Sequence, residues 1–295
     1  GPAVVPSPAA VVADAPLVKV AEYRMREKRF AAAAVVQGDF IYIMGGSNEG
    51  NTVLDSIERF DCRTGVAENF GRLRRGRLWH RAMLVGDTIY VLGGEAVLPN
   101  AQGEPRLTQD DSVEIIDLAT GKISPGPALP EPRRSFAAVL WDGRIHLIGG
   151  CLRAGTKVVR TNTSVVLDLK TQRWSPGAPM LTVREAEAAL IDGSSVVVPG
   201  GYNGVDAVAD VELFNLRDGT WQSLPPLARP ASAHSVAALG RQLFLFGHYD
   251  VPEQCLAYDL RTRRSEAIAV PYQGARHTAA VIHQGKIYVI GGRSS

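Results

Sequence analysis

The chain has 295 residues, enough for one large domain or two small ones, with a core that needs no disulfide or metal. Thirty-two basic and thirty acidic residues give a formal charge of +2, which excludes net charge as an argument for a nucleic-acid or membrane partner. Three cysteines, an odd number, exclude a framework of paired disulfides. No run of eighteen apolar residues is present, so we expect no membrane span.

The first two residues, Gly1-Pro2, are interpreted as the remnant of a cleaved tag and are set aside. We treat residues 3–295 as a single domain. No charged and then apolar leader follows the remnant, and a mature exported protein would lack one too. The compartment is therefore left open between the cytoplasm and the periplasm or exterior, with a soluble protein expected in each case.

An apolar run that ends in Gly-Gly recurs about every fifty residues. Its first glycine stands at positions 45, 93, 149, 200 and 291, and a degenerate copy is Gly247-His248. Self-similarity at one period indicates a repeat architecture. The position sixteen residues before each first glycine also repeats, and it holds Arg29, Arg77, Arg133, Arg184, Ala231 and Ala275.

Each repeat predicts four strands. The first is rich in small residues (31–36 is an example), and the second ends at the glycines. The third alternates apolar and polar residues and ends in Asp or Asn, as in 56–61. The fourth carries a large residue such as Trp174 or Trp221, which can fill the gap between neighbouring sheets. No amphipathic helix pattern appears, so the sequence predicts an all-β protein.

The combination of Pro-Arg, His, an aromatic residue, Gly-Gly, Asp and Trp resembles the Kelch repeat, over nearly the whole chain. The resemblance implies a six-bladed β-propeller of four-stranded antiparallel blades. The fifth repeat departs most, because it lacks both the arginine and the tryptophan. The turn sequences and the preference for Arg over Lys favour a bacterial type.

The last repeat has only its first two strands, because the chain stops three residues after Gly292. Residues 8–14 have the pattern of a third strand, and Val20 falls at the tryptophan position of a fourth strand. We expect residues 3–25 and 270–295 to form one composite blade. This pairing of the N-terminal strands with the C-terminal half-blade would close the ring without an open edge.

The loops that follow the glycines and the loops that precede each first strand are expected on one face, and the second set is rich in arginine. An arginine fork pairs well with carboxylates and phosphates. Alternatively, these arginines are a structural mark of the repeat and bond loop carbonyls. On the first interpretation the expected ligand-binding residues are Arg29, Arg77, Arg133, Arg184, Arg276, Tyr202, Tyr249, His248 and His277; these two histidines break the repeat pattern.

Other chemistry is not indicated. No Cys-x-x-Cys or His-x-x-x-His pair is present, so we expect no metal site and no cofactor. The arginine-rich run at 72–77 is interpreted as a connection between blades, since no aromatic platform for nucleic acid accompanies it. The insertions at 95–111 and 151–162 are long enough to be functional, and we expect the first to be a mobile lid.

Two functions remain open. The favoured one is a non-catalytic, monomeric binding scaffold whose basic face takes an acidic peptide, a partner protein or an anionic small ligand. The alternative is an enzyme. One Kelch family, the sialic-acid mutarotases, has its catalytic Glu in a Gly-Glu-Ala context, followed shortly by an Arg. This chain has Gly94-Glu95-Ala96, and the next arginine, Arg106, is eleven residues on. The resemblance makes Glu95 and Arg106 the catalytic candidates, with an anionic sugar as the substrate.

Overall fold

The computed structural model describes residues 17–294, which form strands and no helices. Five four-stranded antiparallel sheets and one two-stranded sheet follow one another along the chain and confirm the predicted all-β repeats. The first three sheets consist of β1 (Ala33–Gln37), β2 (Phe40–Met44), β3 (Ser56–Asp61) and β4 (Val66–Arg72); β5 (Arg81–Val85), β6 (Thr88–Leu92), β9 (Val113–Asp117) and β10 (Ile123–Pro125); and β12 (Ala137–Trp141), β13 (Arg144–Ile148), β16 (Ser164–Asp168) and β17 (Arg173–Pro176).

The next two sheets are of the same kind, and the sixth unit contains one pair of strands. These elements are β18 (Ala189–Ile191), β19 (Ser195–Pro199), β20 (Val211–Asn215) and β21 (Thr220–Leu224); β22 (Ser235–Leu239), β23 (Gln242–Phe246), β24 (Cys255–Asp259) and β25 (Ser265–Ala267); and β26 (Ala279–His283) with β27 (Lys286–Ile290). We call these six units blades one to six.

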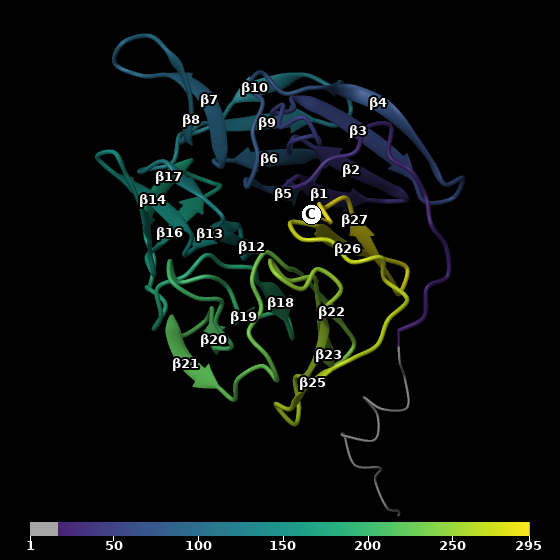
Figure 1. The fold of residues 1–295 in the computed structure, drawn as a ribbon. Helices are drawn as coiled ribbons and strands as arrows, with labels where there is room; N and C mark the ends of the chain where they lie inside the picture. The colour runs from purple at the N-terminus through teal and green to yellow at the C-terminus, as the bar shows by residue number, and fades with distance from the viewer. Residues whose placement is uncertain (1–16, 295) are drawn as a thin grey trace, which may run out of the picture.

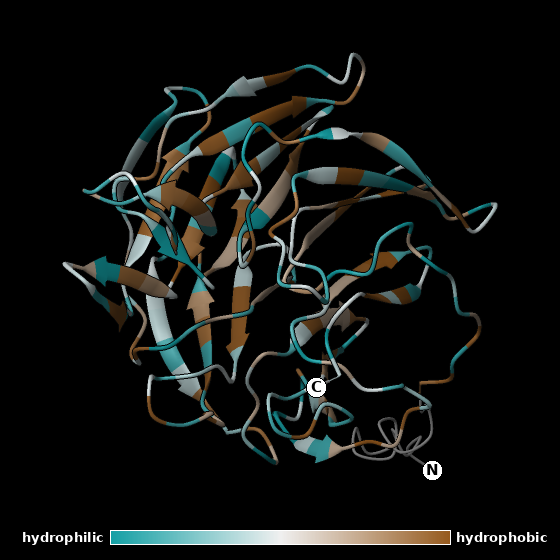
Figure 2. Ribbon diagram, turned by 45° about the horizontal axis from the view of Figure 1, so that its top comes forward, coloured by the Kyte–Doolittle hydropathy of each residue, from teal (hydrophilic) through white to brown (hydrophobic). Residues whose placement is uncertain are grey.

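The blades are arranged around a central axis, with the first strand of each nearest the axis (Figure 1). Small residues such as Ala33 and Ala137 let the inner strands approach one another. The core lies between neighbouring blades, and Figure 2 shows the hydrophobic residues gathered on the strands. Trp174 and Trp221 pack in these gaps, and each indole N–H donates to a carbonyl of a blade connection, Pro127 (2.9 Å) or Ala178 (3.0 Å).

A backbone hydrogen bond links each second glycine to the next blade. The amide of Gly94, for example, donates to the carbonyl of Arg133 at 2.8 Å. Gly94 has a φ of +91°, and a Cβ there would lie 2.6 Å from the carbonyl oxygen of Leu78, so only glycine fits. The same bond runs from Gly292 in blade six to Arg29 before blade one (2.9 Å), and it joins the two ends of the ring.

A second set of bonds connects neighbouring blades around the axis, just before the inner strands. Ala31 donates to the carbonyl of His277, Trp79 to that of Ala31, and Ser135 to that of Trp79, at 2.9–3.0 Å. Ala31, Trp79, Ser135 and His277 all have φ between +52° and +57°, a left-handed conformation that is rare outside glycine. This conformation turns the peptide groups toward the neighbouring blades, so the ring is held by the main chain.

The predicted composite blade is only partly visible. Residues 8–14, the expected third strand, lie outside the described residues. Residues 17–25 form no strand, and Val20, expected at the tryptophan position, is 70% exposed. This segment runs along the outside of the ring, where the Tyr23 ring packs 5.2 Å from that of Phe60. Closure by N-terminal strands stays a prediction.

The two insertions are hairpins and not irregular loops. β7 (Glu95–Pro99) pairs with β8 (Pro105–Gln109), and β14 (Cys151–Ala154) pairs with β15 (Lys157–Arg160) and with the short β11 (Arg133–Arg134). Both hairpins project outward from the ring (Figure 1). The sequence predicts a mobile lid for the first insertion, but its regular strand pairing gives it a fixed shape.

Candidate functional site at the pore mouth

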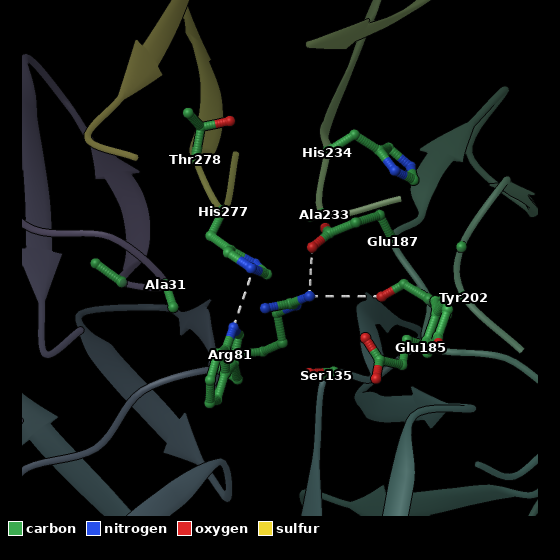
Figure 3. A pocket seen from close by; sticks show the side chains of 14 residues that line it. Ala31, Arg81, Ser135, Glu185, Glu187, Tyr202, Ala233, His234, His277 and Thr278 are labelled. Atoms are coloured by element: carbon green, nitrogen blue, oxygen red, sulfur yellow. Dashed lines mark hydrogen bonds and ion pairs between the residues drawn. The ribbon is translucent and has the colours of Figure 1, made fainter. Parts of the chain in front are cut away.

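A small pocket opens where the inner ends of the blades meet. Its volume of about 50 Å³ is room for a few water molecules, and a larger ligand would therefore bind at its rim. Its walls come from all six blades and combine aromatic, charged and small side chains (Figure 3). The aromatic and charged members of the lining include Trp79, Arg81, Glu187, Tyr202, His234 and His277.

Arg81 crosses this pocket. Its guanidinium, from blade two, pairs with the Glu187 carboxylate of blade four and also donates to the Ala186 carbonyl at 3.4 Å (Figure 3). Burial raises the pKa of Glu187, and Arg81 opposes that shift. The pair connects blades two and four, which are not neighbours in the ring.

The four arginines at the repeated position are buried, whereas our first interpretation predicted that they bind a ligand. Arg29, Arg77, Arg133 and Arg184 are at most 2% exposed. Each guanidinium donates to the carbonyl of the first glycine of its own repeat, for example from Arg133 to Gly149 at 2.9 Å. It donates also to a carbonyl at the start of the third strand, such as that of Thr163 at 2.8 Å. A side chain without exposed surface cannot contact a ligand, so these four hold each blade to its preceding loop, as the structural interpretation expects.

Three of the four buried arginines have a buried carboxylate partner on the third strand. The partners are Glu58 for Arg29, Glu114 for Arg77 and Glu212 for Arg184, at 2.5–2.6 Å. Arg133 has Val165 in the equivalent place, and burial lowers its pKa to about 10. The recurring acid of the third strand is the sequence signal that could have marked these arginines as structural.

The residue after Arg133 lies in the next layer outward. The Arg134 guanidinium lies 4.8 Å over the Trp79 ring, and its Nε is 2.8 Å from Glu95 Oε1. The side chain is 14% exposed. Stacking on an indole and the carboxylate fix the orientation of the guanidinium.

A second stack lies across the pocket. Arg160, at the end of β15, is 4.9 Å over the Tyr202 ring, and its Nε and Nη2 donate to Glu185 at 3.2 and 3.0 Å. The Cys151 thiol donates to the same carboxylate at 3.2 Å. Burial raises the pKa of this thiol to about 12, so the cysteine is not a nucleophile near neutral pH.

The third arginine–aromatic stack brings together four of the residues that the sequence predicts to bind a ligand. Arg276 lies 4.1 Å over the Tyr249 ring and donates to the Tyr249 carbonyl at 3.0 Å. Tyr249 is 50% exposed, and its ring meets that of His277 at 6.3 Å. His248 precedes Tyr249 and accepts a hydrogen bond from the Asp250 amide. Within residues 17–294, no carboxylate lies in ion-pair distance of Arg276, in contrast to Arg134 and Arg160.

The catalytic candidates are separated. Glu95 begins β7 at the mouth, whereas Arg106 is on β8 opposite Leu98, where it is 60% exposed and pairs with Glu104. The hairpin therefore carries Arg106 away, and Arg134 takes the place expected for it. Burial raises the pKa of Glu95 more than Arg134 lowers it.

Trp79, Arg134, Arg160 and Glu185 are site residues that the sequence pattern did not identify. Trp79 had a usable signal, because four other repeats have Ala31, Ser135, Ala186 or Ala233 at that position and the sixth has His277. Arg134 follows the repeat arginine directly and is masked by it. Among residues 17–294, no cluster of three metal-ligating side chains is present, and no helix is long and apolar enough to cross a membrane.

Comparisons with known proteins agree with the repeat. The model of a Kelch-repeats domain (KLHDC2/KLHL20/DRC7) matches residues 109–248, and the Kelch motif model matches residues 28–66. The chain is a Kelch-repeat protein. Kelch-like protein 25 of Xenopus tropicalis is 25% identical over 244 residues, 78% of this chain and 39% of that protein. Spermatocyte protein spe-26 of Caenorhabditis elegans is 34% identical over 128 residues, 42% of this chain and 22% of that protein.

The Kelch chain thus spans about two fifths or less of these curated relatives. The solved structure of YjhT superimposes on it with a TM-score of 0.77 at 13% identity, covering 92% of both chains. At this identity the likeness shows the fold alone, and it confirms the six-bladed propeller. The bacterial type stays a prediction.

Proposed function

We propose that the protein is a non-catalytic binding scaffold that takes an acidic peptide segment of a partner protein on its pore-mouth face. One observation carries the proposal: three arginine–aromatic stacks surround the pocket, and they contain Trp79, Tyr202 and Tyr249. Arginine and large aromatic side chains are the residues that most often dominate binding energy at interfaces.

The three stacks differ in whether their arginine has a carboxylate partner. This difference predicts where on the face the acidic group of a ligand binds. Glu95 and Glu185 neutralise Arg134 and Arg160, whereas the Arg276 guanidinium contacts the Tyr249 carbonyl and ring and has no carboxylate in ion-pair distance among residues 17–294. The acidic group of a ligand is therefore expected beside Arg276 and Tyr249. The other two stacks offer flat aromatic and guanidinium surfaces that suit apolar or peptide groups.

The test uses a fluorescein-labelled decapeptide of alternating Glu and Gly, with its Gln counterpart as the uncharged control. We expect Arg276→Glu to weaken binding of the acidic peptide more than tenfold and added salt to weaken it further. Arg173→Glu is the matched control, because Arg173 lies at the turn between the third and fourth strands of blade three, away from the pore mouth. This variant should bind as wild type. Binding that responds to Arg173→Glu but not to Arg276→Glu would place the ligand on the other face and overturn the proposal.

An anionic sugar and the mutarotase activity remain the alternative, and one observation favours it. A carboxyl group with a raised pKa at a pore mouth, held by an arginine, suits proton transfer. Exchange of N-acetylneuraminate anomers, followed by NMR with wild type and Glu95→Gln, decides it. We expect no acceleration by wild type, because the pocket of about 50 Å³ has room for a few water molecules and not for a sugar. Acceleration by wild type that is lost in Glu95→Gln would show that the protein is an enzyme and would overturn the scaffold proposal.

A further inference from the structure

The β14–β15 hairpin has an open edge. In the sheet order β11-β14-β15, no described strand pairs with the outer side of β15. Ala154 lies opposite Lys157 across the turn, and Thr161 donates to the Gly150 carbonyl at 2.9 Å, which fixes the alternation of the hairpin bonds. The N–H and C=O groups of Val158 and Arg160 therefore point away from β14, toward the open edge.

The side chains of this edge are apolar and basic. Val158 and Val159 are 42% and 44% exposed. The ten residues 151–160 contain basic residues at three positions and no acid. Arg153 faces the same side as Val158, its register partner, and Lys157 shares the side of Val159. Each side of the edge thus combines one valine with a cation that has no carboxylate partner among the described residues, and Arg160, on the side of Val158, is paired with Glu185.

The edge is held in place from two directions. Arg153 donates to Thr108 Oγ1 of the neighbouring hairpin at 2.8 Å and to the Gly155 carbonyl at 2.8 Å, both uncharged acceptors. At the other end, Arg160 is fixed by Glu185. Lys157 has no carboxylate in ion-pair distance among the described residues. A fixed edge loses little entropy when a strand is added to it.

We propose that β15 binds an extended acidic segment of a partner protein by strand addition. Main-chain bonds would come from Val158 and Arg160, apolar contacts from the valines on both sides, and selection for carboxylates from Arg153 and Lys157. The same cations disfavour pairing with the β15 edge of a second copy, since like charges would meet. Only Arg160 is shared with the pore mouth: its side chain belongs to the second stack there, and its main chain faces the β15 edge. The edge is otherwise a separate surface, and the proposal goes beyond the function proposed above.

The probe is a labelled octapeptide with two Val-Val-Glu-Glu repeats, which places valine and glutamate on each side of the added strand. Val158→Pro removes the outward N–H and leaves the bonds to β14. We expect it to weaken binding, measured by fluorescence anisotropy, at least tenfold, while Val158→Ile binds as wild type. N-methylation of alternate peptide amides should have the same effect as Val158→Pro, and the Val158 and Arg160 amides should become protected from hydrogen exchange.

Several results would overturn the proposal. The first is a pattern in which Val158→Pro and the N-methylated peptide both keep wild-type affinity, whereas the double variant Arg153→Glu/Lys157→Glu loses binding. Binding would then depend on charge attraction alone and not on main-chain hydrogen bonds. The others are no binding of the octapeptide at about 1 mM, or self-association of the protein through β15. Should Val158→Pro not fold, the N-methylated peptide carries the test. Arg276→Glu must bind the octapeptide as wild type, which separates this outcome from that of the pore-mouth proposal.

Discussion

Arg133 and Arg134 are consecutive in the chain and lie in two different layers of the propeller. Arg133 is 1% exposed and donates to the carbonyls of Gly149 and Thr163, within its own blade. Arg134 points to the pore mouth, where it stacks on Trp79 and pairs with Glu95 of the preceding blade. In an extended segment, successive side chains point to opposite sides, so register decides which arginine is structural and which can meet a ligand.

The largest effect is expected in the buried layer. Arg184→Met leaves Glu212 with its charge buried and without its guanidinium, and should cost about 3–5 kcal/mol of unfolding free energy in urea titration. Arg217→Met, an exposed change on the same blade, should cost little. Arg184→Met/Glu212→Leu should recover part of the loss, because it removes the unpaired charge. A loss below about 1 kcal/mol in Arg184→Met would contradict the structural role.

The next largest loss of stability is expected on removal of the N-terminal segment. Deleting residues 3–25 removes the packing of Tyr23 on Phe60 and the contact of Leu17 with the core between blades five and six. We expect a loss of about 2 kcal/mol, since Leu17 and Tyr23 are only partly buried and a fully buried large apolar side chain contributes about 1.5–3 kcal/mol. Removing only Gly1 and Pro2 is the control. Unchanged thermal unfolding of the shortened chain would show that the bonds from Gly292 to Arg29 and from Ala31 to His277 close the ring unaided.

Two histidines at different depths, His234 and His248, should contribute differently to the pH dependence of stability. Burial lowers the pKa of His234 to about 3, below the value near 6.5 of the unfolded chain. The unfolded state binds the proton first, so stability falls as pH falls from 6.5 toward 3, by about 2 kcal/mol near pH 5. We expect His234→Gln to remove this part of the pH dependence in calorimetry. His248→Gln, nearer the surface, should remove less; an equal or larger effect would place His248 in the buried layer.

Much of the fold was predictable, because its signals recur. The double glycines, with Gly247-His248 as their degenerate copy, marked the end of the second strand in each blade. The small residues marked the inner strands. The site was less predictable. The sequence pattern placed all repeat arginines at the mouth, but a one-residue offset turns Arg133 inward and Arg134 outward.

The rest depended on contacts between distant residues. Glu114 and Arg77 are 37 residues apart, and Arg160 meets Tyr202 from another blade. Of the expected residues, Arg276, Tyr249, His248 and His277 lie together because the loops of blades five and six converge at the mouth. The insertions gave no strand signal that we recognised, and the fixed hairpins were therefore missed.

The division into two layers is tested most directly by Arg133→Met beside Arg134→Met, measured for unfolding free energy and for binding of the acidic decapeptide. Arg133 loses hydrogen bonds but leaves no buried carboxylate, so its variant should cost about 1–3 kcal/mol and bind as wild type when folded. Arg134→Met leaves Glu95 without its guanidinium, but Glu95 can take up a proton because burial already raises its pKa. The variant should therefore cost less stability than Arg184→Met and weaken binding severalfold. The reverse pattern, with binding lost in Arg133→Met and stability lost in Arg134→Met, would contradict the account.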